Sequence, residues 1–157
     1  MAAIKDPENT LIIETTKGKV VIEMRPDLAP GHVAHIKKLA RESFYDGIVF
    51  HRVIEGFMAQ TGCPKGLGTG GSKYPNLKAE FNAEPHVRGT CSMARSSMPD
   101  SANSQFFICF GDAAFLNKQY TVWGKVIEGM ENVDKIKRGE PVQNPDKMTS
   151  VKVAADV

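Results

Sequence analysis

The sequence predicts a mainly-β domain, a sandwich or a barrel, that also contains two short helices. Three observations lead to this prediction. Short runs rich in β-branched and aromatic residues recur along most of the chain, as is typical of strands. Apolar residues recur at helical spacing in two segments only. The sequence has no internal repeat, low-complexity tract or linker, so we expect one domain over residues 1–157, with residues 1–9 as an N-terminal extension.

The first elements that we expect are a hairpin and a helix. Residues 11–15 and 20–24 are β-branched runs, and the residues between them include Gly18, which accepts positive φ in a tight turn. Pro30 suits the first turn of a helix. Apolar residues at 33, 36, 39 and 40 then form a stripe at helical spacing, and Gly47 closes the segment.

A second short helix is expected at 130–137, where apolar residues again form a stripe. The stretch 62–85 is rich in Gly, Pro, Asn and Lys and shows little periodicity. An irregular connection of this length inside a compact domain usually has a function, so we interpret it as functional. Further strands are expected at 48–54, 89–94, 105–110, 121–127 and 151–154.

Composition and charge exclude several classes of partner. Apolar residues make up 41% of the chain and charged residues 24%, which is ordinary for a soluble globular protein. A net charge of +2 without a run of Lys or Arg argues against nucleic acid. No apolar window is long enough for a membrane span, and residues 1–8 lack the apolar core of a signal peptide. Together with Cys63, Cys91 and Cys109, which we interpret as reduced and mostly buried thiols, these features predict a cytoplasmic protein.

The stretch 50–60 is the most informative part of the sequence. It places Arg52 and Gln60 among large apolar side chains and contains no evident nucleophile or metal site. A guanidinium has a pKa above about 12, so it cannot shuttle protons, but it can donate fixed hydrogen bonds beside an apolar pocket. Such a site suits a reaction in which no bond is broken, and rotation about a peptide bond is one.

Together with 68–71, 92–94, 104–108 and 123–130, this stretch closely resembles the cyclophilins, the peptidyl-prolyl cis-trans isomerases, and in particular their bacterial cytosolic branch. The likeness extends from about Thr10 to the C-terminus. The resemblance implies a closed, eight-stranded antiparallel barrel capped by two α-helices. It also implies faster rotation about X–Pro bonds during protein folding, with proline-containing peptides and unfolded proteins as partners and no cofactor or metal. We expect a monomer, because nothing in the sequence requires self-association.

The resemblance also implies roles for individual residues. Arg52 matches the catalytic arginine, which donates a hydrogen bond to the prolyl nitrogen as the peptide bond twists. Four apolar residues correspond to the walls and floor of the proline pocket: Phe57, Met58, Phe107 and Leu116. The other substrate-binding positions are two glutamines that line the site, a segment that binds the substrate backbone, and a glycine at the rim of a neighbouring pocket: Gln60, Gln105, Ala94, Arg95, Ser96 and Gly68.

The sequence departs from many relatives at three positions of the implied site. Arg95 stands where family members often have asparagine, and we expect this change to tune substrate preference because the contact is made by the backbone. Phe115 and Tyr120 stand where many eukaryotic relatives have tryptophan and histidine. Since the indole N–H of that tryptophan helps to bind cyclosporin, the two residues imply retained isomerase activity with weak cyclosporin binding.

An alternative function is a proline-peptide-binding or chaperone module in which turnover is incidental. Such a binder would be expected to have added interaction domains or charged tails, and the sequence is that of the bare barrel. Two other classes fit poorly. Residues 66–71 satisfy the dinucleotide pattern G-x-G-x-x-G, but Pro64 precedes them and no helix start follows. No G-x-S-x-G elbow presents a serine for hydrolysis.

Overall fold

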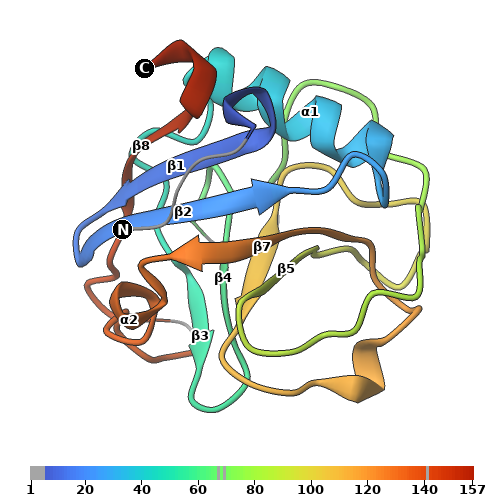
Figure 1. Cartoon of the computed structure of the whole chain (residues 1–157). Helices are drawn as coiled ribbons and strands as arrows, with labels where there is room; N and C mark the ends of the chain where they lie inside the picture. The colour runs from blue at the N-terminus through green and yellow to red at the C-terminus, as the bar shows by residue number, and fades with distance from the viewer. Residues whose placement is uncertain (1–5, 67, 69, 141) are drawn as a thin grey trace.

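The computed structural model describes residues 6–66, 68, 70–140 and 142–157. These residues form an eight-stranded antiparallel sheet with the strand order β3-β4-β6-β5-β7-β2-β1-β8, accompanied by short helices (Figure 1). The strands are β1 (Thr10–Thr15), β2 (Gly18–Met24), β3 (Arg52–Ile54), β4 (Met58–Thr61), β5 (Thr90–Met93), β6 (Phe106–Cys109), β7 (Val122–Glu128) and β8 (Met148–Val153). The α-helices are α1 (Pro30–Arg41) and α2 (Met130–Val133), and the 3₁₀-helices are η1 (Pro7–Asn9), η2 (Ala114–Leu116) and η3 (Ala154–Asp156).

The prediction of a mainly-β fold with eight antiparallel strands and two α-helices is confirmed, but the prediction of a closed barrel is wrong. The sheet is an open half-barrel whose edges are β3 and β8, and no ladder joins these two strands among the described residues. The reason is that another stretch occupies the outer edge of β3. Val53 and Gly139 exchange two backbone hydrogen bonds, each with an N···O distance of 2.8 Å. We call residues 138–140 and 142 the flanking segment.

The predicted strand 48–54 is divided in the structure. Only its last part forms β3, whereas Val49 makes an isolated bridge to Lys147, just before β8. Nearby, Gly47 N–H donates to Met148 O (2.7 Å), and Met148 N–H donates to Ile48 O (2.8 Å). The two edges of the half-barrel therefore approach each other near residues 47–49, which come before β3 in the chain. A few backbone hydrogen bonds connect these residues to the start of β8.

The β1–β2 hairpin and α1 agree with the prediction. Thr15 pairs with Gly18 across the turn, and its Oγ1 donates to Gly18 O (2.6 Å). Helix α1 begins at Pro30 and lies across the upper part of the molecule in Figure 1. Its apolar stripe is buried, and the helix contacts β8. None of the helices in the described part of the chain has the length and apolar character needed to cross a membrane.

Strand β8 begins at Met148, three residues before the predicted start, and two further elements also differ from the prediction. Helix α2 ends at Val133, four residues early, because the chain continues in tighter turns: Ile136 N–H donates to Val133 O (3.1 Å), three residues back. Strand β4 was not predicted. Met58, Ala59 and Thr61 in this strand are all buried, so the sequence lacks the alternation of a strand with one exposed face.

The described residues form two apolar clusters. In the larger one, Trp123 is fully buried and meets Phe106 edge to face, with the ring centroids 5.3 Å apart. Phe106 meets Tyr45 in the same way at 5.6 Å, and the Tyr45 hydroxyl donates to Ser104 O (2.9 Å). The smaller cluster consists of Met58, Phe107, Cys109, Ala113 and Leu116. It contains three of the residues predicted to form the proline pocket.

Candidate functional site

Three strands bring the predicted arginine to one face of the sheet with a glutamine and a phenylalanine. Arg52 of β3 is in register with Gln60 of β4, and Gln60 is in register with Phe107 of β6. Side chains that are directly opposite in an antiparallel pair lie on the same face. They border a cavity of about 140 Å³. Its lining is Arg52, Phe57, Met58, Gln60, Ala94, Arg95, Phe107, Leu116 and Tyr120.

The floor of this smaller cavity is apolar. Met58, Phe107 and Leu116 are at most 8% exposed and belong to the smaller apolar cluster. Phe57 and Tyr120 pack against that cluster as partly buried neighbours, and the Tyr120 ring meets Phe107 edge to face at 5.7 Å. A small apolar ring that entered the cavity would be removed from water, and burial of its surface would favour binding.

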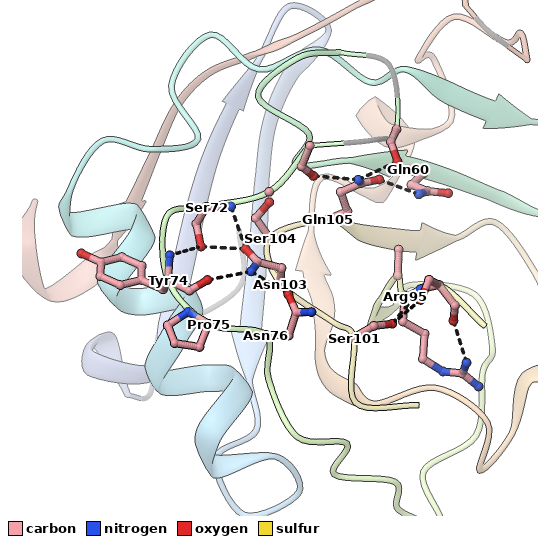
Figure 2. A pocket seen from close by; sticks show the side chains of 15 residues that line it. Gln60, Ser72, Tyr74, Pro75, Asn76, Arg95, Ser101, Asn103, Ser104 and Gln105 are labelled. Atoms are coloured by element: carbon pink, nitrogen blue, oxygen red, sulfur yellow. Dashed lines mark hydrogen bonds between the residues drawn. The ribbon is translucent and has the colours of Figure 1, made fainter. Parts of the chain in front are cut away.

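A line of hydrogen bonds runs from Arg52 to the Gly-rich stretch. Arg52 Nη1 donates to Gln60 Oε1 (3.4 Å), and Gln60 Nε2 donates to Gln105 Oε1 (3.0 Å). Gln105 Nε2 donates in turn to the carbonyl oxygens of Gly68 and Gly70, each at 3.0 Å (Figure 2). The two predicted glutamines thus connect the arginine to the irregular stretch 62–85 and hold each other's amide groups in place.

Arg52 has a second partner that the sequence did not indicate. Its Nε donates to Glu140 Oε2 at 2.7 Å, and the two side chains are 40% and 58% exposed. Glu140 belongs to the flanking segment and is 88 positions away along the chain. No local motif signals a contact between residues so far apart, so sequence patterns alone could not have found it.

A larger cavity of about 630 Å³ adjoins the smaller one. Gln60, Ala94 and Arg95 line both cavities and form the border between them. Gly68 and Ser96 line only the larger cavity, so the predicted site residues are spread over both. The complete lining of the larger cavity is Gln60, Gly68, Gly70, Gly71, Ser72, Tyr74, Pro75, Asn76, Ala94, Arg95, Ser96, Ser101, Asn103, Ser104 and Gln105.

Asn103 organises one wall of the larger cavity. Its Oδ1 accepts hydrogen bonds from the N–H (2.7 Å) and the hydroxyl (2.6 Å) of Ser72. Its Nδ2 donates to Tyr74 O (3.0 Å) and to Asn76 Oδ1 (3.1 Å), as Figure 2 shows. One amide therefore holds three residues of the irregular stretch 62–85. The sequence had not singled out any of these residues.

Arg95 contributes its side chain to the border between the cavities. Its Nε and Nη2 donate to Gln119 O (3.0 and 2.7 Å), and its Nη1 donates to Ser96 O (2.9 Å). The guanidinium carbon lies 4.7 Å from the centroid of the Tyr120 ring, within the range of a cation–π contact. The side chain is thus a positively charged part of the wall, whereas the sequence had suggested a backbone role only.

Two of the three backbone N–H groups of residues 94–96, which are predicted to contact the substrate backbone, donate to acceptors within the protein. Ala94 N–H donates to Gln105 O (3.0 Å), and Ser96 N–H donates to Ser101 Oγ (2.9 Å). For the Arg95 N–H, the described part of the chain provides no acceptor. Among these three donors, only that of Arg95 is open to an extended peptide.

Phe115 lies outside both cavities. It is 71% exposed, and its ring centroid is 5.5 Å from that of Phe57, which lines the smaller cavity. Both Phe115 and Leu116 belong to η2, and the turn buries Leu116 while it exposes Phe115. The phenylalanine therefore flanks the smaller cavity and would meet only a ligand that extends beyond it.

A buried histidine, His86, packs against the ring of Phe107. The rings of His86 and Phe107 are stacked, with centroids 6.1 Å apart, and His86 is 1% exposed. His86 Nε2 lies 3.0 Å from Ser92 Oγ, and Nδ1 lies 3.1 Å from Asn117 Oδ1. Burial lowers the pKa of His86, so the imidazole is neutral at pH 7. Its position is that of a structural group beneath the cavity floor.

Buried histidines predict a loss of stability in mildly acidic solution. Burial lowers the pKa of His35, His51 and His86 in the folded protein, whereas the unfolded chain keeps values of about 6.5. Because the unfolded state then binds more protons, the free energy of unfolding should decrease as the pH falls below about 6.5. Urea unfolding should therefore have a lower midpoint at about pH 5.5 than at about pH 7.5. An unchanged urea midpoint would contradict this prediction. So would NMR titrations of the folded protein in which these histidines have pKa values above about 6.5.

The site combines an apolar cavity, a guanidinium held at its border and an open backbone N–H. These groups can bind an apolar ring and donate hydrogen bonds to an adjoining amide. Within the described residues, no group of three His, Cys, Asp or Glu side chains could hold a metal ion. All three cysteine side chains are buried.

Comparisons with known proteins agree on one family. The model of the family described as "Cyclophilin type peptidyl-prolyl cis-trans isomerase/CLD" matches residues 10–155. A probable peptidyl-prolyl cis-trans isomerase of Brucella suis biovar 1 (strain 1330) is 57% identical, over 99% of this chain and 87% of the relative. Peptidyl-prolyl cis-trans isomerase B of Bacillus subtilis (strain 168) is 46% identical, over 78% of this chain and 85% of the relative.

Two solved structures extend the likeness to three dimensions. A cyclophilin from Hirschia baltica matches with a TM-score of 0.90 and 32% identity, over 97% of this chain and 76% of the other. A cyclophilin-type isomerase from Cryptosporidium parvum, crystallised in the presence of the dipeptide Ala-Pro, matches with a TM-score of 0.85 and 26% identity, over 92% of this chain and 98% of the other.

Proposed function

Because the chain belongs to the cyclophilin-type peptidyl-prolyl cis-trans isomerases, we propose that the two adjoining cavities are the site at which it accelerates rotation about X–Pro peptide bonds. The observation that carries this proposal is the arrangement of Arg52, Gln60 and Phe107, which are in register on three strands beside the smaller cavity. The proline ring of a substrate occupies that cavity, and Arg52 faces the peptide bond that precedes the ring.

The reaction needs stabilisation of a twisted amide. Resonance gives the peptide bond a rotation barrier of about 18–20 kcal/mol, and X–Pro isomers exchange over tens to hundreds of seconds. In the twisted state the prolyl nitrogen regains its lone pair and becomes a hydrogen-bond acceptor. A guanidinium N–H from Arg52 that reaches this nitrogen binds the transition state more strongly than either planar isomer, and such differential binding lowers the barrier.

Substrate binding divides between the two cavities. The apolar floor formed by Met58, Phe107 and Leu116 takes the proline ring. A cyclophilin-type isomerase from Cryptosporidium parvum, which has a similar fold, was crystallised in the presence of a proline dipeptide, Ala-Pro. The N–H of Arg95 pairs with the peptide backbone at the border between the cavities. The next part of an extended peptide then enters the larger, mostly polar cavity.

The test is magnetisation-exchange NMR on a short Ala-Pro-Phe peptide. The uncatalysed exchange is too slow to give cross-peaks between the cis and trans forms, so their appearance with a trace of protein demonstrates catalysis. If the protein bound the peptide without accelerating exchange, the alternative of a proline-peptide-binding or chaperone module would replace the proposed function. Single-domain organisation over residues 1–157, a monomeric state and a cytoplasmic location remain predictions.

Cyclosporin should bind weakly because Phe115 cannot donate a hydrogen bond. Phe115 is exposed beside Phe57, where an indole would offer an N–H to a large ligand that extends past the smaller cavity. We expect inhibition of wild type to need micromolar drug. Phe115→Trp should lower the inhibition constant about three- to tenfold, the effect of one added hydrogen bond. Nanomolar inhibition of wild type, or equal inhibition of both proteins in a cyclosporin titration, would contradict this prediction.

A further inference from the structure

The flanking segment brings Glu140 to the proposed catalytic arginine from outside the sheet. It is attached to β3 and the residue before it at two places. Val53 and Gly139 exchange backbone hydrogen bonds of 2.8 Å, and Val142 N–H donates to His51 O (3.1 Å). The arginine lies between His51 and Val53 in the chain, so the flanking segment passes directly beside it.

Glu140 and Gln60 hold the guanidinium of Arg52 at different nitrogens. Nε donates to Glu140 Oε2 at 2.7 Å, and Nη1 donates to Gln60 Oε1 at 3.4 Å. Because a guanidinium is planar and rigid, contacts at two of its nitrogens define the orientation of the whole group. For Nη2, the described residues provide no acceptor, so its N–H groups are available to a ligand in the smaller cavity.

We propose that Glu140 is a positioning residue for the isomerase reaction. Its carboxylate keeps the Arg52 guanidinium in the orientation that presents Nη2 to the twisted peptide bond. This inference rests on the function proposed above. Without the carboxylate, the guanidinium would sample other orientations and would have to be ordered in each turnover, whereas a preorganised donor avoids that cost.

The same contact could instead hold the arginine away from the substrate. Two observations favour positioning. The carboxylate occupies Nε, so the end of the guanidinium is left for a ligand. In addition, Arg52 lines the smaller cavity while it is paired with Glu140. The ion pair and the substrate therefore use different parts of one side chain.

Glu55 offers a matched control. It forms an ion pair with another residue of the flanking segment: Arg138 Nε donates to Glu55 Oε2 at 2.5 Å. The Glu55 side chain is 78% exposed. Glu55→Gln therefore weakens an exposed ion pair between the β3–β4 turn and the same segment, and it leaves the contact between Glu140 and Arg52 intact.

The experiment compares Glu140→Ala, Glu140→Gln and Glu55→Gln with wild type. The kcat and KM for the Ala-Pro-Phe peptide come from NMR exchange rates over a series of peptide concentrations. Glu140→Ala should lower kcat about three- to fivefold with little change in KM, as expected for an exposed ion pair. Glu140→Gln keeps an oxygen that can accept the hydrogen bond from Arg52 Nε, so its kcat should fall less than that of Glu140→Ala. Glu55→Gln should retain the wild-type kcat.

A second measurement reports on the arginine directly. The Nε–H resonance of Arg52 should shift in both Glu140 variants and stay in place in Glu55→Gln. Equal kcat values for Glu140→Ala and Glu55→Gln, a higher kcat in Glu140→Ala, or an unchanged Arg52 resonance would overturn the inference. A wild-type protein that does not accelerate exchange would instead refute the proposed function, so the two failures are distinguishable.

Discussion

Arg52→Ala should lower kcat/KM for the Ala-Pro-Phe peptide by about 10²–10³-fold while the protein remains folded. The expected size is that of removing one preorganised donor from a reacting centre, roughly 3–4 kcal/mol. The Arg52 side chain is 40% exposed, so its removal leaves no cavity in the apolar clusters. NMR exchange gives the rate, and the urea unfolding midpoint shows whether the variant is folded.

Arg52→Lys should lose nearly as much activity. An ammonium on a flexible chain cannot hold both Glu140 and Gln60 while it presents a further N–H in a fixed direction. If either variant kept most of the wild-type rate, the apolar cavity and not the guanidinium would supply the catalysis. The expected outcome is a folded Arg52→Ala protein that still binds the peptide but has a kcat/KM lower by about 10²–10³-fold.

Gly62→Ala should be the most destabilising single-methyl change near the site, by about 3 kcal/mol or more. Gly62 follows β4 with φ +93°, and an added Cβ would lie 2.3 Å from Ser104 O and 2.9 Å from Gln105 Cα. A left-handed backbone costs a residue with a side chain roughly 1–2 kcal/mol, and overpacking adds about 1–3 kcal/mol. Since the atoms in the way belong to the backbone, no side chain can rotate to relieve the contact. Urea unfolding measures the loss.

Gly56→Ala is the control for this prediction. Gly56, in the turn between β3 and β4, also has positive φ (+73°), but an added Cβ would meet no atom within 4 Å. Gly56→Ala should lower the free energy of unfolding only by the cost of the strained backbone, about 1 kcal/mol. A Gly62→Ala protein as stable as Gly56→Ala would show that the packing between the end of β4 and residues 104–105 can adjust.

The parts of the fold and site that follow from the sequence are those set by local patterns. The β1–β2 hairpin follows from two β-branched runs around Gly18, and α1 from Pro30 and its apolar stripe. Arg52 and Gln60 could be placed together because both lie in the stretch 50–60 that resembles the cyclophilins, whereas strand β4, which pairs them in register, was not predicted.

The parts that could not be predicted depend on residues that are remote in sequence. The sheet does not close because Gly139, and not β8, pairs with the outer edge of β3. Gly139 makes two backbone hydrogen bonds with Val53 there. Backbone pairing of this kind leaves no trace in side-chain patterns. The partnership of Glu140 with Arg52 follows from the same placement. The role of Asn103 depends on how an aperiodic stretch folds, and composition alone does not specify that.

Strand β1 has consequences for how the chain assembles. One of its neighbours, β2, comes from its own hairpin, but the other, β8, comes from the far end of the chain, so Leu11 pairs with both Ile22 and Val153. Closing so large a loop costs entropy before any pairing compensates for it, and folds with such remote contacts form slowly. Until β8 arrives, the outer edge of β1 is an unpaired template on which other chains can add. We therefore expect the refolding yield to decrease as protein concentration rises, because a chain whose β8 has not yet paired exposes the outer edge of β1 to other chains.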